Sequence, residues 1–151
     1  MAKNKTGMRG RFNPRHPEKY IGDTNKIFGR SSWEFKFFAW LDSTPSVLKW
    51  SSETIKIKYV SPIDGKVHTY SPDCLVVYRD STGAIKKEIV EIKPYNETIE
   101  RPNSTPQQRQ DVAVNKAKWV AAAQFCKMNG LEFRVITEKT LMPKKIVRKK
   151  T

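Results

Sequence analysis

Two acidic residues lie beside or inside apolar stretches in the middle of the chain. Asp73 directly precedes the run Cys74–Tyr78, and Glu91 lies near the end of the run Ile85–Ile92. Lys93 follows Glu91 by two residues, so both side chains point to the same face if this segment is a strand. Two carboxylates about 4 Å apart repel each other by about 4 kcal/mol at an effective dielectric constant near 20. A hard divalent cation such as Mg²⁺ or Mn²⁺ offsets more of that repulsion than one lysine does, so these residue types predict a metal site.

Each of these residues also has an ordinary structural interpretation. Asp73 follows a proline and belongs to a residue type that often caps turns. Glu91 and Lys93 match a surface cross-strand ion pair, which contributes little to stability. The apolar neighbours of Glu91 argue against full exposure of that strand. Taken one at a time, the residues therefore leave both interpretations open.

A hairpin is expected to bring the two carboxylates together. Residues 66–78 are predicted to form a long strand that an internal proline interrupts, and residues 85–93 are predicted to form the next strand. The turn over 80–83 favours antiparallel pairing, which sets Asp73 opposite a residue between Glu91 and Lys93. Pairing through this turn therefore predicts that both acids lie on one face of a sheet.

The other predicted elements complete a mixed α/β domain. A half-exposed strand is expected over 54–60, because apolar and basic residues alternate there. A short buried helix over 33–41 follows a serine cap, and a long helix over 107–129 ends at a glycine. A last strand is expected over 131–137. The predicted order is helix, three antiparallel strands, helix, strand.

The positive charge is concentrated at the two ends of the chain. The 151 residues carry a net charge of +14, and this length corresponds to one domain. Residues 1–30 and 139–151 each contribute +6, so we expect two basic arms around a nearly neutral domain over 31–138. Basic arms favour a polyanionic partner, of which nucleic acid is the commonest, although an acidic protein would also fit. The candidate DNA-binding residues are Lys3, Lys5, Arg9, Arg11, Arg15, Lys144, Lys145, Arg148, Lys149 and Lys150.

Composition also excludes several classes of protein. No apolar run approaches the roughly 20 residues that a membrane helix needs, and the N-terminal segment has no apolar core of a signal peptide. Cys74 and Cys126 lie in apolar stretches, which favours two reduced core thiols over a disulfide or a zinc site. We therefore expect an intracellular protein.

Longer phrases of the sequence resemble known nucleases. Pro72-Asp73 followed by Glu91-Ile92-Lys93 resembles the PD-(D/E)xK nuclease motif, and the predicted element order matches the core of that superfamily. The surrounding phrases PSVLKWSSETIKIKYVSPIDGKVHTYSPDCLVVYRD and IVEIKP are similar to its transposon-end endonuclease branch. The phrases YIGDTNKIFGRSSWEFKFFAWLDSTPS and NKAKWVAAAQFCKMNGLEFRVITEK extend the resemblance to head completion nucleases of large tailed bacteriophages, from about Tyr20 to Lys139.

This resemblance implies a restriction-endonuclease-like core and a Mg²⁺-dependent deoxyribonuclease, in which Mn²⁺ substitutes. The implied metal ligands are Asp73, Glu91 and the backbone carbonyl of Ile92, with Glu34 as a further candidate. The implied catalytic residues are Glu34, Asp73, Glu91 and Lys93. Lys93 would orient the attacking water and stabilise the transition state.

The resemblance also implies partners and a location. The expected substrate is double-stranded DNA, cut without sequence preference, and specifically packaged phage DNA during head completion and head–tail joining. Phage head, portal or neck proteins are candidate partners, in the host cytoplasm or on the phage head or virion, with no membrane involved. Two alternatives remain open: a non-catalytic basic protein that binds DNA or helps neck assembly, and a junction-resolving nuclease of the same superfamily.

Glu34 has the strongest competing interpretation. The phrase SSWE that contains it matches a capping box, in which the glutamate binds the backbone amide at the start of the helix. Three other polar residues have only weak claims to the site. His68 is expected at the surface, and Lys116 and Gln124 on the long helix are expected to be exposed or packed in the core.

Overall fold

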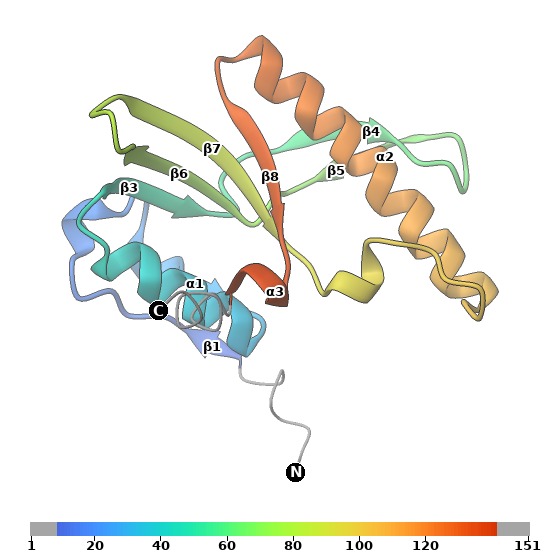
Figure 1. Ribbon diagram of the computed structural model, residues 1–151, viewed down its shortest axis with the longest axis horizontal. Helices are drawn as coiled ribbons and strands as arrows, with labels where there is room; N and C mark the ends of the chain where they lie inside the picture. Colours follow the sequence, from blue (N-terminus) through green and yellow to red (C-terminus); the bar gives the residue numbers. More distant parts are fainter. Residues whose placement is uncertain (1–8, 142–151) are drawn as a thin grey trace, which may run out of the picture.

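A four-stranded mixed sheet forms the centre of the structure, a computed structural model that describes residues 9–141 (Figure 1). Its strands, in spatial order, are β3 (Val47–Ser52), β6 (Cys74–Arg79), β7 (Ile85–Ile92) and β8 (Glu132–Ile136). The first three are antiparallel to their neighbours, whereas β8 runs parallel to β7. The predicted mixed α/β architecture is therefore confirmed.

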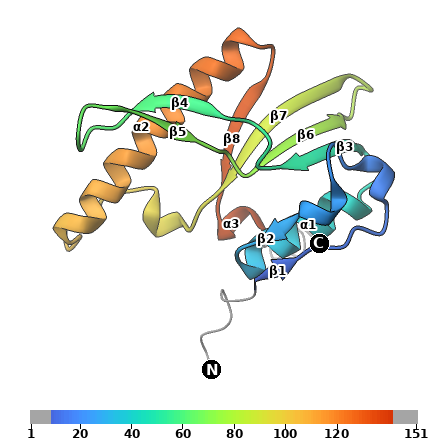
Figure 2. The same cartoon turned by 180° about the vertical axis from the view of Figure 1, so that it is seen from behind.

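Helices cover the two faces of this sheet. Helix α1 (Ser32–Ser43) lies against one face, and helix α2 (Pro106–Met128) lies on the other side with the hairpin of β4 (Ile57–Val60) and β5 (Val67–Tyr70) beside it (Figures 1 and 2). The remaining elements are short: β1 (Gly10–Arg11), η2 (Pro17–Lys19), η3 (Thr24–Lys26), β2 (Phe28–Gly29), η4 (Tyr95–Glu97) and α3 (Glu138–Leu141). No helix within residues 9–141 is both long and apolar enough to span a membrane.

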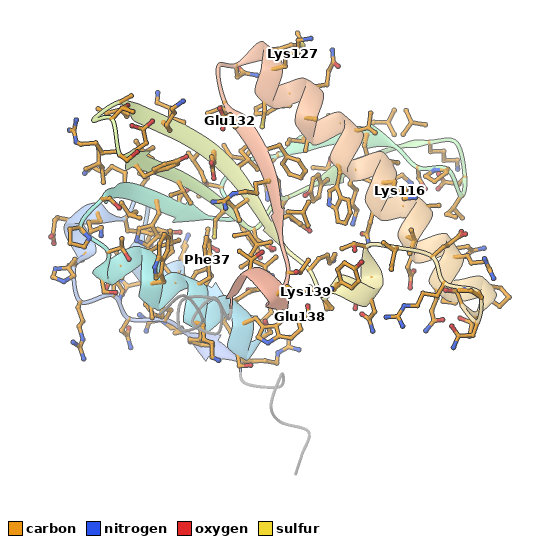
Figure 3. The ribbon with its side chains drawn as sticks, in the orientation of Figure 1. Phe37, Lys116, Lys127, Glu132, Glu138 and Lys139 are labelled. Carbon is orange, nitrogen blue, oxygen red and sulfur yellow. The ribbon has the colours of Figure 1, made fainter. Side chains whose placement is uncertain are left out.

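The sheet separates two hydrophobic cores. The core on the α1 side contains Ile27, Phe37, Phe38, Leu41, Val47, Trp50, Cys74, Val76, Val90, Ile92 and Ile136. The core on the α2 side contains Ile57, Tyr70, Ile89, Ala122 and Cys126. Phe37 lies between α1 and the sheet in Figure 3. Strand β7 contributes to both cores, which explains why its second half, Glu88–Ile92, is buried throughout.

Helix α1 begins and ends close to the predicted positions. The Ser31 hydroxyl caps the helix by accepting a hydrogen bond from the Glu34 amide. The buried residues Phe37, Phe38 and Leu41 then recur at helical spacing. At the other end, the Lys19 side chain donates hydrogen bonds to three carbonyls, those of Leu41, Asp42 and Thr44. A cation at this end also interacts favourably with the helix dipole.

The prediction for the first of the three antiparallel strands was wrong. The strand beside β6 is β3, over Val47–Ser52, and not the predicted strand over 54–60. The sequence obscures β3 because its burial does not alternate strictly and its register shifts between Val47 and Lys49. The segment predicted over 54–60 forms β4, which pairs only with β5.

The predicted strand over 66–78 divides into β5 and β6, which belong to different sheets. The division falls at Ser71–Asp73, around Pro72, which lacks a backbone donor for a continuous ladder. The other predicted elements are confirmed with small changes of boundary. The long helix starts from a capping box between Thr105 and Gln108 and is followed by Gly130 with a positive φ of 70°.

The N-terminal segment contacts the core where the structure describes it. Ile27 has no exposed surface, and Phe12 packs against the same cluster. The backbone amides of Arg15 and His16 donate to the buried carboxylate of Asp42 in α1. Of the predicted arm over 1–30, residues 9–30 thus lie against the domain, and residues 1–8 lie outside the described residues. The predicted tail over 139–151 is described only as far as residue 141, and the domain boundaries stay predictions.

Candidate active site

Strand register places the two acids of the predicted site opposite each other. The last pair of the β6–β7 ladder is Cys74 with Val90, so the next residues outward, Asp73 and Glu91, face each other where the ladder ends. Ile89, two residues before Glu91, packs in the core on the α2 side. Because side chains alternate along a strand, both carboxylates lie on that same side of the sheet.

Asp73 is fixed by the backbone around it. Its Oδ2 accepts a hydrogen bond of 2.6 Å from the Ile92 amide, and its carbonyl accepts one of 3.0 Å from the Glu53 amide. The amide and carbonyl of one strand residue point to the same side in an antiparallel pair. The Ile92 carbonyl therefore points toward the place where β6 has ended, next to Asp73.

Glu91 is buried and held from two sides. Its Oε1 accepts a hydrogen bond of 2.8 Å from the Tyr70 hydroxyl, and its Oε2 lies 3.9 Å from the Lys93 Nζ. The carboxylate has only 7% of its side chain exposed, whereas the lysine has 25%. Asp73, Glu91 and Lys93 thus converge at one end of the β6–β7 pair, as the sequence predicted.

The surroundings of the two carboxyls disfavour the ionisation of both. Burial and the facing Glu91 raise the pKa of Asp73 well above its usual value, against the hydrogen bond from Ile92. Burial also raises the pKa of Glu91, against the Tyr70 hydrogen bond and the charge of Lys93. Burial and Glu91 together raise the pKa of Tyr70. The site therefore carries more negative charge than its own lysine neutralises, which is the situation that a bound cation would relieve.

Glu34 approaches the pair from the first turn of α1. Its negative charge adds to the effects that raise the pKa of Asp73. Its Oε1 accepts a hydrogen bond of 3.0 Å from the amide of Arg30, one residue before the Ser31 cap. The predicted capping box is therefore only partly formed, because the Glu34 side chain binds the amide of Arg30 and not that of the cap residue Ser31. Capping occupies one carboxylate oxygen and leaves the second available for another role.

Arg30 connects Glu34 to the end of the sheet. The Arg30 guanidinium donates to the carboxylate of Glu53, whose own amide donates to the Asp73 carbonyl. Glu53 has a φ of +56°, which is uncommon for a residue other than glycine. These contacts place the start of α1 beside Asp73.

Sequence reasoning missed Lys118 on α2. Burial and the nearby charge of Lys93 lower the pKa of Lys118, against the charges of Glu91 and Asp73, so it lies close to all three groups. The signal was its helical spacing: Lys118 lies three residues after the buried Asn115 and four before the buried Ala122. A lysine within a buried helical stripe requires an explanation.

The donor set fits one metal ion better than a complete protein cage. Between residues 9 and 141, no three Asp, Glu, His or Cys side chains gather closely enough to form a metal cluster. Asp73, Glu91 and the Ile92 carbonyl are instead the neighbouring oxygen donors that could hold an ion here. This set suits Mg²⁺, which is commonly bound by one or two carboxylates while keeping several waters.

The remaining candidates lie away from this site or outside the described residues. His68 is exposed and binds Asp64, and Lys116 and Gln124 are exposed on α2. Arg9, Arg11 and Arg15 are exposed in the N-terminal segment. The other predicted DNA-binding residues, which are Lys3, Lys5, Lys144, Lys145, Arg148, Lys149 and Lys150, lie outside the described residues.

Comparison with known proteins identifies the family. The sequence pattern of the TnsA-like endonuclease N-terminal domain matches residues 44–138, which include Asp73, Glu91 and Lys93. The chain belongs to this endonuclease family. Membership implies a restriction-endonuclease-like fold and a nuclease that acts on DNA.

A curated relative extends the likeness beyond the TnsA-like domain. The chain is 36% identical over 141 residues to the head completion nuclease of Enterobacteria phage T4, covering 85% of this chain and 90% of that protein. It is therefore a homologue of the head completion nuclease, and the resemblance found in the sequence is confirmed.

Proposed function

We propose that this chain is a Mg²⁺-dependent deoxyribonuclease that hydrolyses phosphodiester bonds at the site formed by Asp73, Glu91 and Lys93. One observation carries the proposal: two opposed carboxylates, Glu91 buried and Asp73 half-buried, share one side of the sheet, with a lysine amine 3.9 Å from Glu91. Within an endonuclease family, this arrangement supports metal-assisted hydrolysis over a structural ion pair.

The ligands of the metal would be Asp73, Glu91 and the Ile92 carbonyl. Bound Mg²⁺, or Mn²⁺ in its place, supplies a Lewis acid that activates water and neutralises charge on the phosphate. Tyr70 holds the Glu91 carboxylate in one orientation through its hydroxyl. The Lys93 amine lies beside the acidic pair, where it would orient the attacking water and stabilise developing negative charge.

Glu34 is the proposed fourth residue of the site. Its Oε1 is occupied by the Arg30 amide, which fixes the side chain, and its Oε2 remains to bind the metal or a water beside it. Its charge already acts on Asp73. This role differs from capping alone, and the two can be separated because glutamine preserves the capping bond.

We further propose that the substrate is double-stranded DNA, bound without sequence preference and cut during completion of a phage head. The name of the phage T4 relative and its 36% identity support this setting, as does the net charge of +14. The basic residues of 1–30 and 139–151 would contact phosphates, which position DNA without specifying sequence. Head, portal or neck proteins are the proposed partners in assembly.

The test is cleavage of supercoiled and linear DNA by purified protein with Mg²⁺, Mn²⁺ or EDTA. We expect cleavage with either metal, none with EDTA, and none from the Asp73→Asn variant. Asp23→Asn serves as the matched control, because Asp23 caps an exposed turn and asparagine caps equally well. DNA binding without cleavage under every condition would instead favour a non-catalytic assembly protein. Cleavage restricted to branched DNA would favour a junction-resolving nuclease.

A further inference from the structure

A cavity of about 480 Å³ lies between α2 and the segment that follows β7. Two lysines from different elements line it: Lys93 just beyond the end of β7, and Lys118 on α2. The cavity continues along α2 past Asn115 to Gln108. It therefore adjoins the acidic pair through Lys93 and leads away from it along the helix.

Lys118 is held without a carboxylate of its own. Its Nζ lies 5.5 Å from the ring centroid of Tyr70 and 5.9 Å from that of Tyr59. No Asp or Glu among residues 9–141 lies within ion-pair distance of this amine, although it is half-buried. Two aromatic faces stabilise a cation only modestly, and an unpaired, partly desolvated ammonium is otherwise unfavourable. Burial and the nearby Lys93 lower the pKa of Lys118, because both make its charged form less favourable.

We propose that Lys118 binds a backbone phosphate of the DNA strand in this cavity. This phosphate would be next to the one that is cut beside Lys93. The rings of Tyr59 and Tyr70 contact the Lys118 amine, and Lys118 lines the cavity. Tyr70 also donates to Glu91, so the residue that supports Lys118 also supports the acidic pair. Lys118 is a binding residue for a second phosphate, and this inference rests on the proposed nuclease function.

One of the two acids of the cavity, Asp111, lies away from this end. Asp111 precedes Lys118 by seven residues, which corresponds to about 10 Å along the helix axis. Asp111 also accepts a hydrogen bond from Gln107, whereas the other acid, Glu97, lies beside Asn115, whose side-chain amide donates to the Glu97 carbonyl. A phosphate therefore finds its positive partners at the end of the cavity where Lys93 and Lys118 meet.

The test compares Lys118→Met with Lys116→Met. Methionine keeps an apolar side chain of similar length against the two tyrosines and removes the charge. Lys116, labelled in Figure 3, is exposed on the same helix and provides a control of equal charge change. Each substitution is made in the Asp73→Asn background, and binding to a short fluorescent duplex is measured in EDTA from about 50 to 200 mM NaCl.

We expect Lys118→Met to weaken binding by on the order of tenfold and to reduce the log–log salt slope by about 0.9 relative to Lys116→Met. Lys118→Arg should restore binding and slope, because it returns the charge. Equal salt slopes for the two methionine variants would overturn the inference, whatever happens to their melting temperatures. If Lys118→Met does not fold, Lys118→Gln is measured in its place: a salt slope below that of the Asp73→Asn protein would support phosphate contact, and an unchanged slope would overturn the inference.

Cleavage by the otherwise unmodified protein separates this result from the proposed function. If the unmodified protein cuts DNA with Mg²⁺ and the Lys118→Met single variant binds and cuts DNA equally well, only the inference about Lys118 fails. If the unmodified protein does not cut DNA with any of the metals, the nuclease proposal itself fails. Activity of the single variant at saturating DNA should recover more fully than at low DNA, since a second phosphate contact contributes to binding of substrate and transition state alike.

Discussion

Replacing Asp73 by Asn should stabilise the protein while it abolishes cleavage. The opposed pair Asp73 and Glu91 holds two carboxyls whose ionisation is mutually unfavourable. Asparagine keeps the shape of the side chain, and its carbonyl oxygen still accepts from the Ile92 amide. The substitution thus removes the charge and retains most of the packing.

The size of the effect follows from the strand geometry. Opposed side chains on antiparallel strands start about 5 Å apart, which gives a repulsion of about 3 kcal/mol at an effective dielectric constant near 20. Lys93, 3.9 Å from Glu91, offsets part of this repulsion, and protonation of Asp73 relieves another part. We expect a net stabilisation of about 1–2 kcal/mol near neutral pH.

The pH dependence gives a sharper test than one value. The pKa of Asp73 is raised in the folded state, so its ionisation favours unfolding. The unmodified protein should lose stability relative to Asp73→Asn as pH rises from the unfolded pKa near 3.9 toward the raised folded pKa. Below that range the carboxyl is protonated in both states, and the difference should vanish.

Urea unfolding in EDTA across this pH range measures the difference, with Asp23→Asn as the control for a surface Asp-to-Asn change. Adding Mg²⁺ should then stabilise the unmodified protein, by about 2.7 kcal/mol at 100 times its dissociation constant, and should stabilise Asp73→Asn much less. The reasoning is refuted if Asp73→Asn is the less stable protein at pH 8, or if the difference does not change with pH.

Three other perturbations test the rest of the site. Glu34→Gln should cut DNA at least about 100-fold more slowly with an unchanged melting temperature, and full activity would restrict Glu34 to capping. Tyr70→Phe should cost about 1–3 kcal/mol and move the acid limb of the pH–rate profile upward, because its hydroxyl lowers the pKa of Glu91; an unmoved limb would contradict this. Deleting 144–151 should weaken DNA binding and reduce the salt slope while cleavage recovers at high DNA concentration; an unchanged slope with failed head assembly would indicate a protein partner for the tail.

The convergence of the acids could be predicted because it depends on local sequence. The turn over 80–83 is short, so it fixes the pairing of β6 with β7 and brings Asp73 opposite Glu91. The alternation of a strand then places Lys93 on the side of Glu91. Both arguments need only the two strands and the turn between them, and neither depends on the rest of the fold.

The partners of these strands could not be predicted in the same way. Strand β3 pairs with β6 across a long connection that includes the whole β4–β5 hairpin, and no local turn signal specifies that pairing. The hairpin itself has an obvious turn at Asp64-Gly65, which favoured the wrong strand as the neighbour of β6. Lys118 was missed for a related reason, because its role depends on where α2 lies against the site.

The third carboxylate depends on a part of the chain that precedes the endonuclease pattern at 44–138. Glu34 is held by the Arg30 amide, and the Arg30 guanidinium is held by Glu53, whose amide binds the Asp73 carbonyl. The left-handed backbone of Glu53 costs free energy that its surroundings must offset. Because these contacts run from the start of α1 to the end of β3, the position of Glu34 is set by the sheet as well as by its own helix. If Glu34 acts as proposed, the segment before the endonuclease pattern belongs to the architecture of the site, and a protein that began at residue 44 would lack it.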